Sequence, residues 1–307
     1  RMDLFYATAA FLFGLTFGSF LNVVIHRVPR GESIVFPSSA CPKCHHRIKA
    51  YDNIPVISWL LLGGRCRNCR EPISARYAVV ELLVAMLFLA CYWRFGLSLS
   101  MLKYCVFSFL ITGLIFIDAE HKLLPDALTL PGLVSGLIFS WFIPINDLLA
   151  EVLPAYFQRA RGLNWHWLSL SDAALGAIVG AAFIFGVGFV YLQARGVEGM
   201  GLGDVKLMAM VGAFLGVKLT VFTIFTASLL GTIFGLSLML TVWVQRTRRR
   251  MERHRETRDI ARKHAWASAR LVYRYYQIPF GVFLGSMALV ALFFGPRLMS
   301  WYWRLYL

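Results

Sequence analysis

Charged residues are scarce in this chain. Asp, Glu, Lys and Arg together make up 15% of its 307 residues, whereas 58% are hydrophobic. Soluble domains carry about 25% charged residues, so this chain cannot build the charge-rich surface of an ordinary soluble domain. Acids are the scarcest group, with 16 Asp and Glu against 31 Lys and Arg. The composition therefore places the chain in lipid, and each acid within an apolar stretch needs its own explanation.

Several common signatures of soluble enzymes are also missing. The sequence has no Walker loop, no repeat of fixed period and no low-complexity tract. Glycines alternate at 199–203, but no strand pattern precedes them, so a dinucleotide fingerprint is excluded. The formal charge of +15 is explained by membrane topology and by attraction to anionic lipid headgroups, and we expect no nucleic-acid partner.

Long apolar runs are what the chain has instead. A helix needs roughly 20 residues to cross a bilayer core of about 30 Å. The first run is not preceded by a basic region or followed by a cleavage site, so it is expected to be a span of the mature protein. We predict an all-α polytopic membrane protein with about eight transmembrane helices: Leu4–Ile25, Tyr77–Trp93, Leu97–Ile117, Ala127–Ile145, Ala173–Ala194, Leu207–Val217, Leu219–Gln245 and Ile278–Pro296.

Basic residues predict the orientation. Lys and Arg near span ends stay in the cytoplasm. Eight spans with both termini outside place the loops 26–76, 118–126, 195–206 and 246–275 inside, and these hold 23 of the 31 Lys and Arg residues. The opposite orientation would leave only 8 inside. The predicted organisation is a first helix at 1–25, a cytoplasmic loop domain at 26–76 and a membrane domain with seven further helices at 77–307.

Two stretches between spans are unusually long. Residues 245–275 are densely basic, and we expect them to lie on the lipid surface. Residues 143–171 are nearly neutral and contain Trp165 and Trp167, which suit a membrane interface on the outer side.

Four cysteines form two CxxC pairs in the first loop, at Cys41, Cys44, Cys66 and Cys69. Two such turns supply four thiolates to one tetrahedral ion and leave no open position, so we predict a structural zinc ribbon. Disulfides are the main alternative, but they are rare in a reducing cytoplasm. His45 and His46 are further possible ligands. A loop of this length has little core of its own, so a metal would stabilise it.

Four acids lie within or beside the apolar runs: Glu81, Asp118, Asp126 and Asp204. Asp118 and Asp204 both fall at cytoplasmic span ends, so they can share one depth. Two adjacent carboxyl groups cannot both ionise cheaply, and one can hold a proton while the other activates water for attack on a peptide bond. Each aspartate alone would more often be an interfacial residue or a helix cap.

Glycines beside Asp204 strengthen this interpretation. Gly201 and Gly203 precede it in a Gly-x-Gly-Asp pattern. An extended substrate can approach the backbone closely where side chains are absent. Asp126 follows Pro125 and is also typical of a helix start.

These motifs, in this order, resemble the type IV prepilin peptidase family of Gly-x-Gly-Asp membrane aspartyl proteases. The resemblance covers nearly the whole chain and rests on residues 18–29, the CxxC pairs, and the stretches 76–81, 118–126, 198–206 and 278–281.

The resemblance implies an inner-membrane bacterial enzyme whose active site faces the cytoplasm. It would remove the leader of prepilins or pseudopilins after a glycine, with Asp118 and Asp204 as catalytic residues, and then methylate the new N-terminus with S-adenosylmethionine. We expect Glu81, Asp126 or Glu198 to attract the basic leader. Gly63 and Gly64 are the residues expected to approach the methyl donor.

Three other functions are compatible with parts of the sequence. A transporter also uses intramembrane acids and glycine-broken helices, but it does not explain the cysteines. A scaffold protein could recruit partners through its zinc and basic loops. A related protease with another substrate would not need the cysteine loop.

Overall fold

The computed structural model describes residues 2–145, 147, 165–196, 201–254, 257–275 and 279–306. Within these residues every regular element is a helix, apart from two isolated β-bridges, which confirms the all-α prediction. The short elements are the 3-10 helices η1 (Val28–Arg30) and η2 (Ala50–Asn53) and helix α2 (Ile57–Leu61). The long helices are α1 (Met2–Arg27), α3 (Arg76–Phe95), α4 (Leu99–His121), α5 (Asp126–Phe142), α7 (Trp165–Arg195), α8 (Leu202–His254), α9 (Arg258–Tyr275) and α10 (Phe280–Tyr306).

Six described helices are long and apolar enough to cross a membrane, namely α1, α3, α4, α7, α8 and α10. Helix α5 is apolar but has only 17 residues. The predicted count of eight spans is therefore not confirmed. The difference arises at α5, which is short, and at α8, which contains both expected runs Leu207–Val217 and Leu219–Gln245 as two arms joined at Gly216.

Helix α8 folds back on itself at Gly216. Gly216 has φ 78° and ψ −179°, a non-helical conformation that interrupts the helix. A Cβ atom placed on Gly180 of α7 would lie 2.5 Å from the Met208 carbonyl oxygen and 2.9 Å from Thr220 Cγ2. These two residues would be about 18 Å apart along a straight helix. The two arms of α8 therefore lie side by side against α7, as a helical hairpin.

Small residues let the helices pack closely. Gly18 of α1 faces α3, where a Cβ atom would lie 2.6 Å from Glu81 Cα. Gly212 of α8 lies against the backbone of Gly176 in α7 in the same way. Without a strong hydrophobic drive between helices in lipid, such close contacts are a main source of association.

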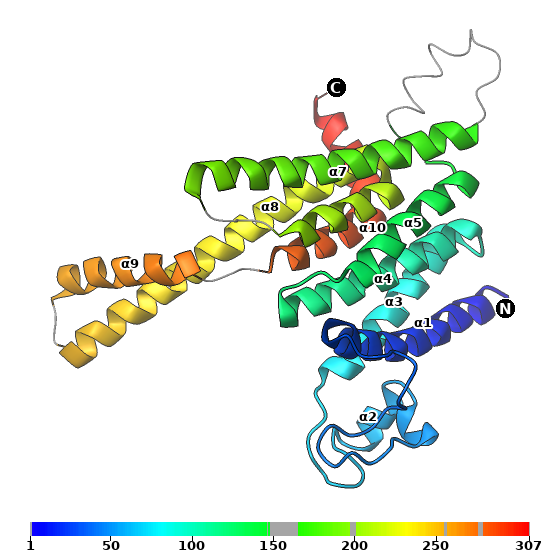
Figure 1. The fold of residues 1–307 in the computed structure, drawn as a ribbon, viewed down its shortest axis with the longest axis horizontal. Helices are drawn as coiled ribbons and strands as arrows, with labels where there is room; N and C mark the ends of the chain where they lie inside the picture. Colours follow the sequence, from blue (N-terminus) through cyan, green and yellow to red (C-terminus); the bar gives the residue numbers. More distant parts are fainter. Residues whose placement is uncertain are drawn as a thin grey trace.

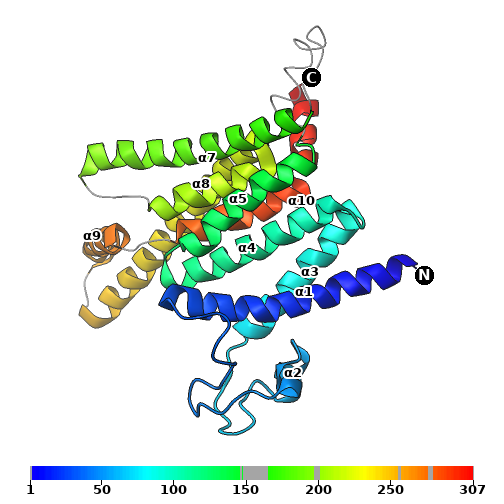
Figure 2. The same ribbon diagram turned by 45° about the vertical axis from the view of Figure 1, so that its right-hand side comes forward.

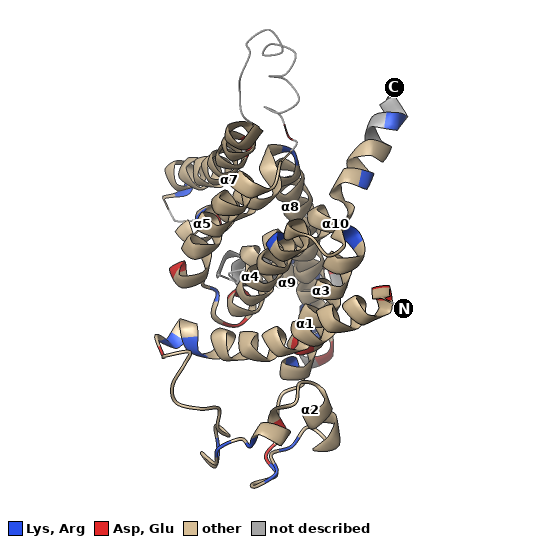
Figure 3. Cartoon of the chain, turned by 90° about the vertical axis from the view of Figure 1, so that its right-hand side faces the viewer, with Lys and Arg blue, Asp and Glu red and all other residues tan. Residues whose placement is uncertain are grey.

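Two segments project from this bundle (Figure 1). The loop between α1 and α3, with η2 and α2, hangs below the bundle, and Figure 2 shows the same arrangement. At the left of both views, α9 and the end of α8 project from the bundle on the side opposite the N-terminus. In Figure 3 the helix bodies are mostly tan, with Lys and Arg in the loop below α1 and at a few places on the helices, including α10.

The basic stretch 245–275 was expected to be a loop, but its described residues are helical. Helix α8 continues to His254, and α9 returns along it. The Trp243 and Trp266 rings meet edge to face at 5.9 Å, and Trp243 Nε1 donates to the Arg262 carbonyl at 3.2 Å. The stretch is thus a helical hairpin with its own small contact surface.

The stretch 143–171 lies partly outside the described residues, at 146 and 148–164. Its described ends are attached to the bundle. The Ser169 hydroxyl accepts from Ile145 N at 2.9 Å and donates to the Ile143 carbonyl at 3.0 Å. Asp147 Oδ2 accepts the Lys218 N–H at 3.1 Å, immediately after the break in α8.

Candidate active site

Asp118 lies in the last turn of α4. This helix starts at a Ser98 cap, whose hydroxyl accepts from Met101 N at 3.3 Å. Asp118 is only 5% exposed, and its Oδ2 accepts the Val282 N–H at 3.0 Å. That bond fixes the carboxyl group against the start of α10, where unpaired backbone N–H groups favour an anion.

Asp204 lies in the first turn of α8 and is half-buried. Its backbone N–H donates to the Gly201 carbonyl at 3.1 Å. The Asp118 and Asp204 carboxyl groups are close enough to interact electrostatically. The two acids expected to act together are therefore neighbours, although they come from separate helices.

Glycines allow close packing around this acid pair. A Cβ atom on Gly281 would lie 2.9 Å from Asp118 Oδ2 and 3.1 Å from Leu124 Cδ1. One on Gly203 would lie 2.9 Å from Leu124 Cβ. Leu124, in the loop between α4 and α5, thus packs between the glycines that flank the aspartates. Gly201 is exposed, and nothing closer than 3.9 Å would meet a side chain there.

Asp126 begins α5, as expected, but its charge is already paired. Both its oxygens accept from Lys206 Nζ, at 2.6 and 2.8 Å. This ion pair joins the loop after α4 to the first turns of α8. Glu198 lies outside the described residues, so its position is not defined.

An ion pair that the sequence interpretation missed lies near Asp118. Arg76, at the start of α3, bonds Glu120, two residues after Asp118 in α4. Glu81, further along α3, is 8% exposed and accepts the Val56 N–H at 2.7 Å. Helix α3 therefore connects the aspartate end of α4 to the cysteine loop.

The four loop cysteines form one compact cluster. Their sulfur atoms all lie within 4.8 Å of one another, and Cys41 Sγ and Cys69 Sγ are 3.8 Å apart. Four sulfurs bound to zinc at about 2.3 Å in a tetrahedron are about 3.8 Å apart. No disulfide joins the six cysteines. The donor set thus fits a zinc ion.

The two CxxC turns share one geometry. His45 N donates to the Cys41 carbonyl at 2.9 Å, and Arg70 N donates to the Cys66 carbonyl at 3.0 Å. His45 and Arg70 have φ values of 53° and 61°. The repeated turn brings both cysteines of each pair to the same point.

Backbone N–H groups also point at the sulfurs. A hydrogen bond from the His46 backbone, with one from the Asn68 side chain, lowers the pKa of Cys44 to about 6. The Glu71 backbone favours the Cys69 thiolate, but desolvation and the neighbouring sulfurs raise the pKa of Cys69 to about 12. Four adjacent thiols cannot all ionise without a cation, and a bound divalent metal would remove this conflict.

A cavity of about 1000 Å³ lies between the cysteine loop and the ends of α1 and α3. Its walls include Asn22, Trp59, Tyr77 and Glu81. Gly63 and Gly64, expected to contact a methyl donor, are not among its lining residues. Gly64 packs on the Trp59 ring instead, where a Cβ atom would lie 3.0 Å from Cζ2.

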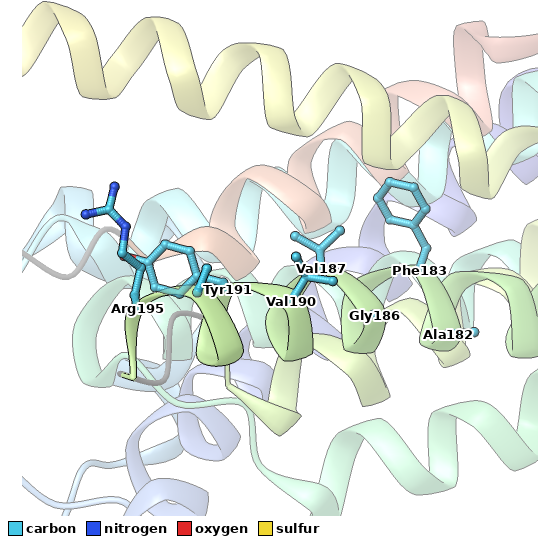
Figure 4. Close-up of a pocket in the computed structure, with 8 residues that line it drawn as sticks. Ala182, Phe183, Gly186, Val187, Val190, Tyr191 and Arg195 are labelled. Atoms are coloured by element: carbon cyan, nitrogen blue, oxygen red, sulfur yellow. The ribbon is translucent and has the colours of Figure 1, made fainter.

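A second hollow of about 630 Å³ lies along α7 (Figure 4). All eight residues that line it belong to this helix, and Phe183, Val187 and Tyr191 are among them. No acidic residue lines this hollow, so it is separate from Asp118 and Asp204. An apolar groove on a membrane helix suits a lipid chain better than hydrolytic chemistry.

Comparisons with known proteins agree with this arrangement. Residues 12–95 match the bacterial peptidase A24 N-terminal domain, and residues 104–236 match the type IV leader peptidase family. A prepilin leader peptidase/N-methyltransferase of Aeromonas hydrophila is 33% identical over 97% of this chain and 93% of that relative.

Two further relatives carry the same name. The one from Pseudomonas putida is 35% identical over 76% of this chain and 82% of that protein, and the one from Dichelobacter nodosus is 38% identical over 75% and 82%. No solved structure was found to match the chain. On the matches to both domains and to full-length relatives, this chain belongs to the type IV leader peptidase family.

Proposed function

We propose that this chain cleaves the leader from type IV prepilins or pseudopilins after a glycine, on the cytoplasmic side, and then methylates the new N-terminus. The observation that supports the peptidase activity is the proximity of the Asp118 and Asp204 carboxyl groups. Relatives named as both peptidase and methyltransferase support the pairing of the two activities.

In the proposed cleavage step, one carboxylate takes a proton from a water molecule, which attacks the scissile carbonyl carbon. The protonated partner donates to the carbonyl oxygen, and the C–N bond breaks as a proton reaches the leaving amine. The Val282 N–H fixes the Asp118 carboxyl group, whereas the bond from Asp204 to the Gly201 carbonyl involves only the backbone N–H of Asp204. We assign the water-activating role to the pair rather than to one residue.

Charge distribution supports a cytoplasmic active site. The Arg76–Glu120 pair places the Asp118 end of α4 beside the end of α3 that carries the cysteine loop. That loop and the α8–α9 hairpin are rich in Lys and Arg, which are retained inside. The same orientation puts the cleavage site at the cytoplasmic face of a bacterial inner membrane.

Gly201 offers exposed backbone that an extended leader can approach, whereas Gly203 already packs against Leu124. We assign Gly201 to substrate binding, with Glu198 as the acid that attracts the basic leader. Asp126 has a second role in this proposal, because its bond to Lys206 holds the loop after α4 against α8.

Cys41, Cys44, Cys66 and Cys69 would hold a structural zinc ion. The ion would stabilise the loop by cross-linking its two turns. S-adenosylmethionine would supply an activated methyl group, and the cavity beneath the loop is large enough for such a ligand.

The test is cleavage of a purified prepilin by the reconstituted protein and its Asp118→Asn and Asp204→Asn variants. Each variant removes one titrating group and keeps the shape, so cleavage should fall by at least about a thousandfold with little change in melting temperature. Asp259→Asn, at an exposed position of α9, is the matched control. Native rates in either active-site variant would contradict the proposal. An unmutated protein that yields no cleaved peptide would favour a transporter or a scaffold.

A further inference from the structure

The cavity beneath the cysteine loop has a polar floor made by α1 and α3. Ser19, Asn22 and Glu81 all line it. They meet because Gly18 brings α1 onto the backbone of α3 beside Glu81. Asn22 Nδ2 donates to the Tyr77 carbonyl at 3.0 Å, which fixes the direction of the amide.

This floor has one buried hydrogen-bond acceptor that is not satisfied among the described residues. Asn22 is 3% exposed, and its Oδ1 has no hydrogen-bond partner among the described residues. A buried carbonyl without a hydrogen-bond partner is destabilising, so a native structure retains one only for a reason. Glu81 uses Oε2 for the Val56 N–H, and the Ser19 hydroxyl lies beside its carboxyl group.

Glu81 also differs from the other acids of this cavity. Asp52 bonds Arg67 through both oxygens, at 2.7 to 3.0 Å, and Glu71 pairs with Lys43 at 3.5 Å. Glu32 is exposed. Glu81 is the lining acid that is buried, and no ion pair involving it is found among the described residues.

We propose that Ser19, Asn22 and Glu81 form a binding site for a primary ammonium group. The group that occupies this site is the α-amino group created when the leader is removed. An ammonium group has three N–H donors, and this floor offers three acceptors, one of them charged. The inference rests on the proposed function, and it assigns the methyl-acceptor end of the second reaction.

The position suits a peptide that has just been cut. Arg76 bonds Glu120 beside the aspartates, and Glu81 is five residues further along α3, a rise of about 7.5 Å. The new N-terminus would therefore travel along the first turns of α3 from one site to the other. Trp59 and Tyr77, on the cavity wall, can cover an apolar first side chain.

The test compares two synthetic peptides with the sequence of a cut pilin N-terminus, one with its α-amino group and one in which hydrogen replaces that group. Binding to the full-length protein is measured at about pH 6.5, where an α-amine is largely protonated. The unmutated protein should prefer the amine about tenfold to a hundredfold, as expected for a charge-assisted hydrogen bond. Glu81→Gln keeps an acceptor for the Val56 N–H but loses the charge, and the preference should fall to within about threefold of none. Glu32→Gln, an exposed acid of the same cavity, is the matched control and should keep the preference.

An unchanged preference in Glu81→Gln would overturn the inference. The inference would also be overturned if Glu81→Gln kept this preference but lost affinity for S-adenosylhomocysteine relative to methylthioadenosine. The site would then hold the amino group of the methyl donor. Prepilin cleavage is measured on the same preparations. Cleavage without the amine preference refutes only this inference, whereas absence of cleavage by the unmutated protein refutes the proposed function.

Discussion

Two pairs of acids lie at opposite ends of the bundle. Asp118 and Asp204 interact at one end, and Asp147 and Asp172 interact at the other. One member of each pair also accepts a backbone N–H at the start of a helix: Asp118 from Val282, and Asp147 from Lys218. Acid proximity and a backbone bond are therefore not sufficient to mark an active site.

The surroundings of the two pairs differ. Gly201 is exposed beside Asp204, which leaves backbone that a substrate can reach. Asp147 is 3% exposed and covers Gly216, where a Cβ atom would collide with its carboxyl group. Asp147 thus acts as a cap for the second arm of α8, and its neighbour Asp172 is fully buried, whereas Asp204 of the first pair is only half-buried.

The largest expected effect is on stability at the structural end. Asp147→Ala leaves the Lys218 N–H without its acceptor at the break in α8, so the free energy of unfolding should fall by about 2–4 kcal/mol. Denaturant titration in mixed micelles measures it. The cleavage rate per folded molecule should stay the same, and a large loss of that rate would mean that the two ends are coupled.

Gly216→Ala tests the same cap from the other side. The φ of 78° is unfavourable for alanine, and the new Cβ would meet the Asp147 carboxyl group, so unfolding should become easier by about 1–3 kcal/mol. In an Asp147→Ala background the collision with the carboxyl group is gone, and the backbone strain and a 3.1 Å contact with Ile145 Cγ2 remain. The second change should then cost about 1 kcal/mol less, whereas strict additivity would show that the two residues do not interact.

The sequence predicted much of the helical bundle but not how its parts meet. The apolar runs located α1, α3, α4, α5, α7 and α10 to within a few residues, except for the extra turns of α7 and α10. The helical hairpin at 246–275 was missed because its basic residues carry no apolar span. The break within α8 was expected between the runs Leu207–Val217 and Leu219–Gln245, and the structure places it two residues earlier, at Gly216.

In the candidate site, too, the sequence predicted individual residues but not the contacts between distant segments. The motifs predicted Asp118, Asp204 and the cysteine set, and the structure brings each group together. Gly281, Asp147 and the Arg76–Glu120 pair were not predicted, since their contacts join segments far apart in the sequence. An acid two residues after the apolar run ending at Ile145 was the one available signal for Asp147. The catalytic roles themselves stay predictions until the variants are assayed.

Gly281→Ala should act on the chemistry rather than on the fold. Its Cβ would lie 2.9 Å from Asp118 Oδ2, so the carboxyl group must move by a few tenths of an ångström. Misplacing a catalytic group in this way lowers turnover by about tenfold to a hundredfold. Gly186→Ala, in α7, is the matched control, because nothing lies within 4 Å of its Cβ. Equal effects of both changes on kcat would argue against a role for Asp118 geometry.

The smallest expected effect concerns the ion pair beside the active site. Lys206→Met removes the partner of Asp126, but the two side chains are 36% and 57% exposed, so water screens much of the interaction. The free energy of unfolding should fall by less than about 1 kcal/mol. If Asp126 attracts the basic leader, freeing its charge should lower the KM for prepilin, whereas a purely positioning role should lower kcat instead.

Asp126→Asn separates these outcomes further, because it breaks the same pair without leaving an unpaired acid. A lower KM in Lys206→Met that is absent in Asp126→Asn would assign the leader contact to Asp126, and equal losses of kcat in both variants would assign the pair to holding the loop at Leu124.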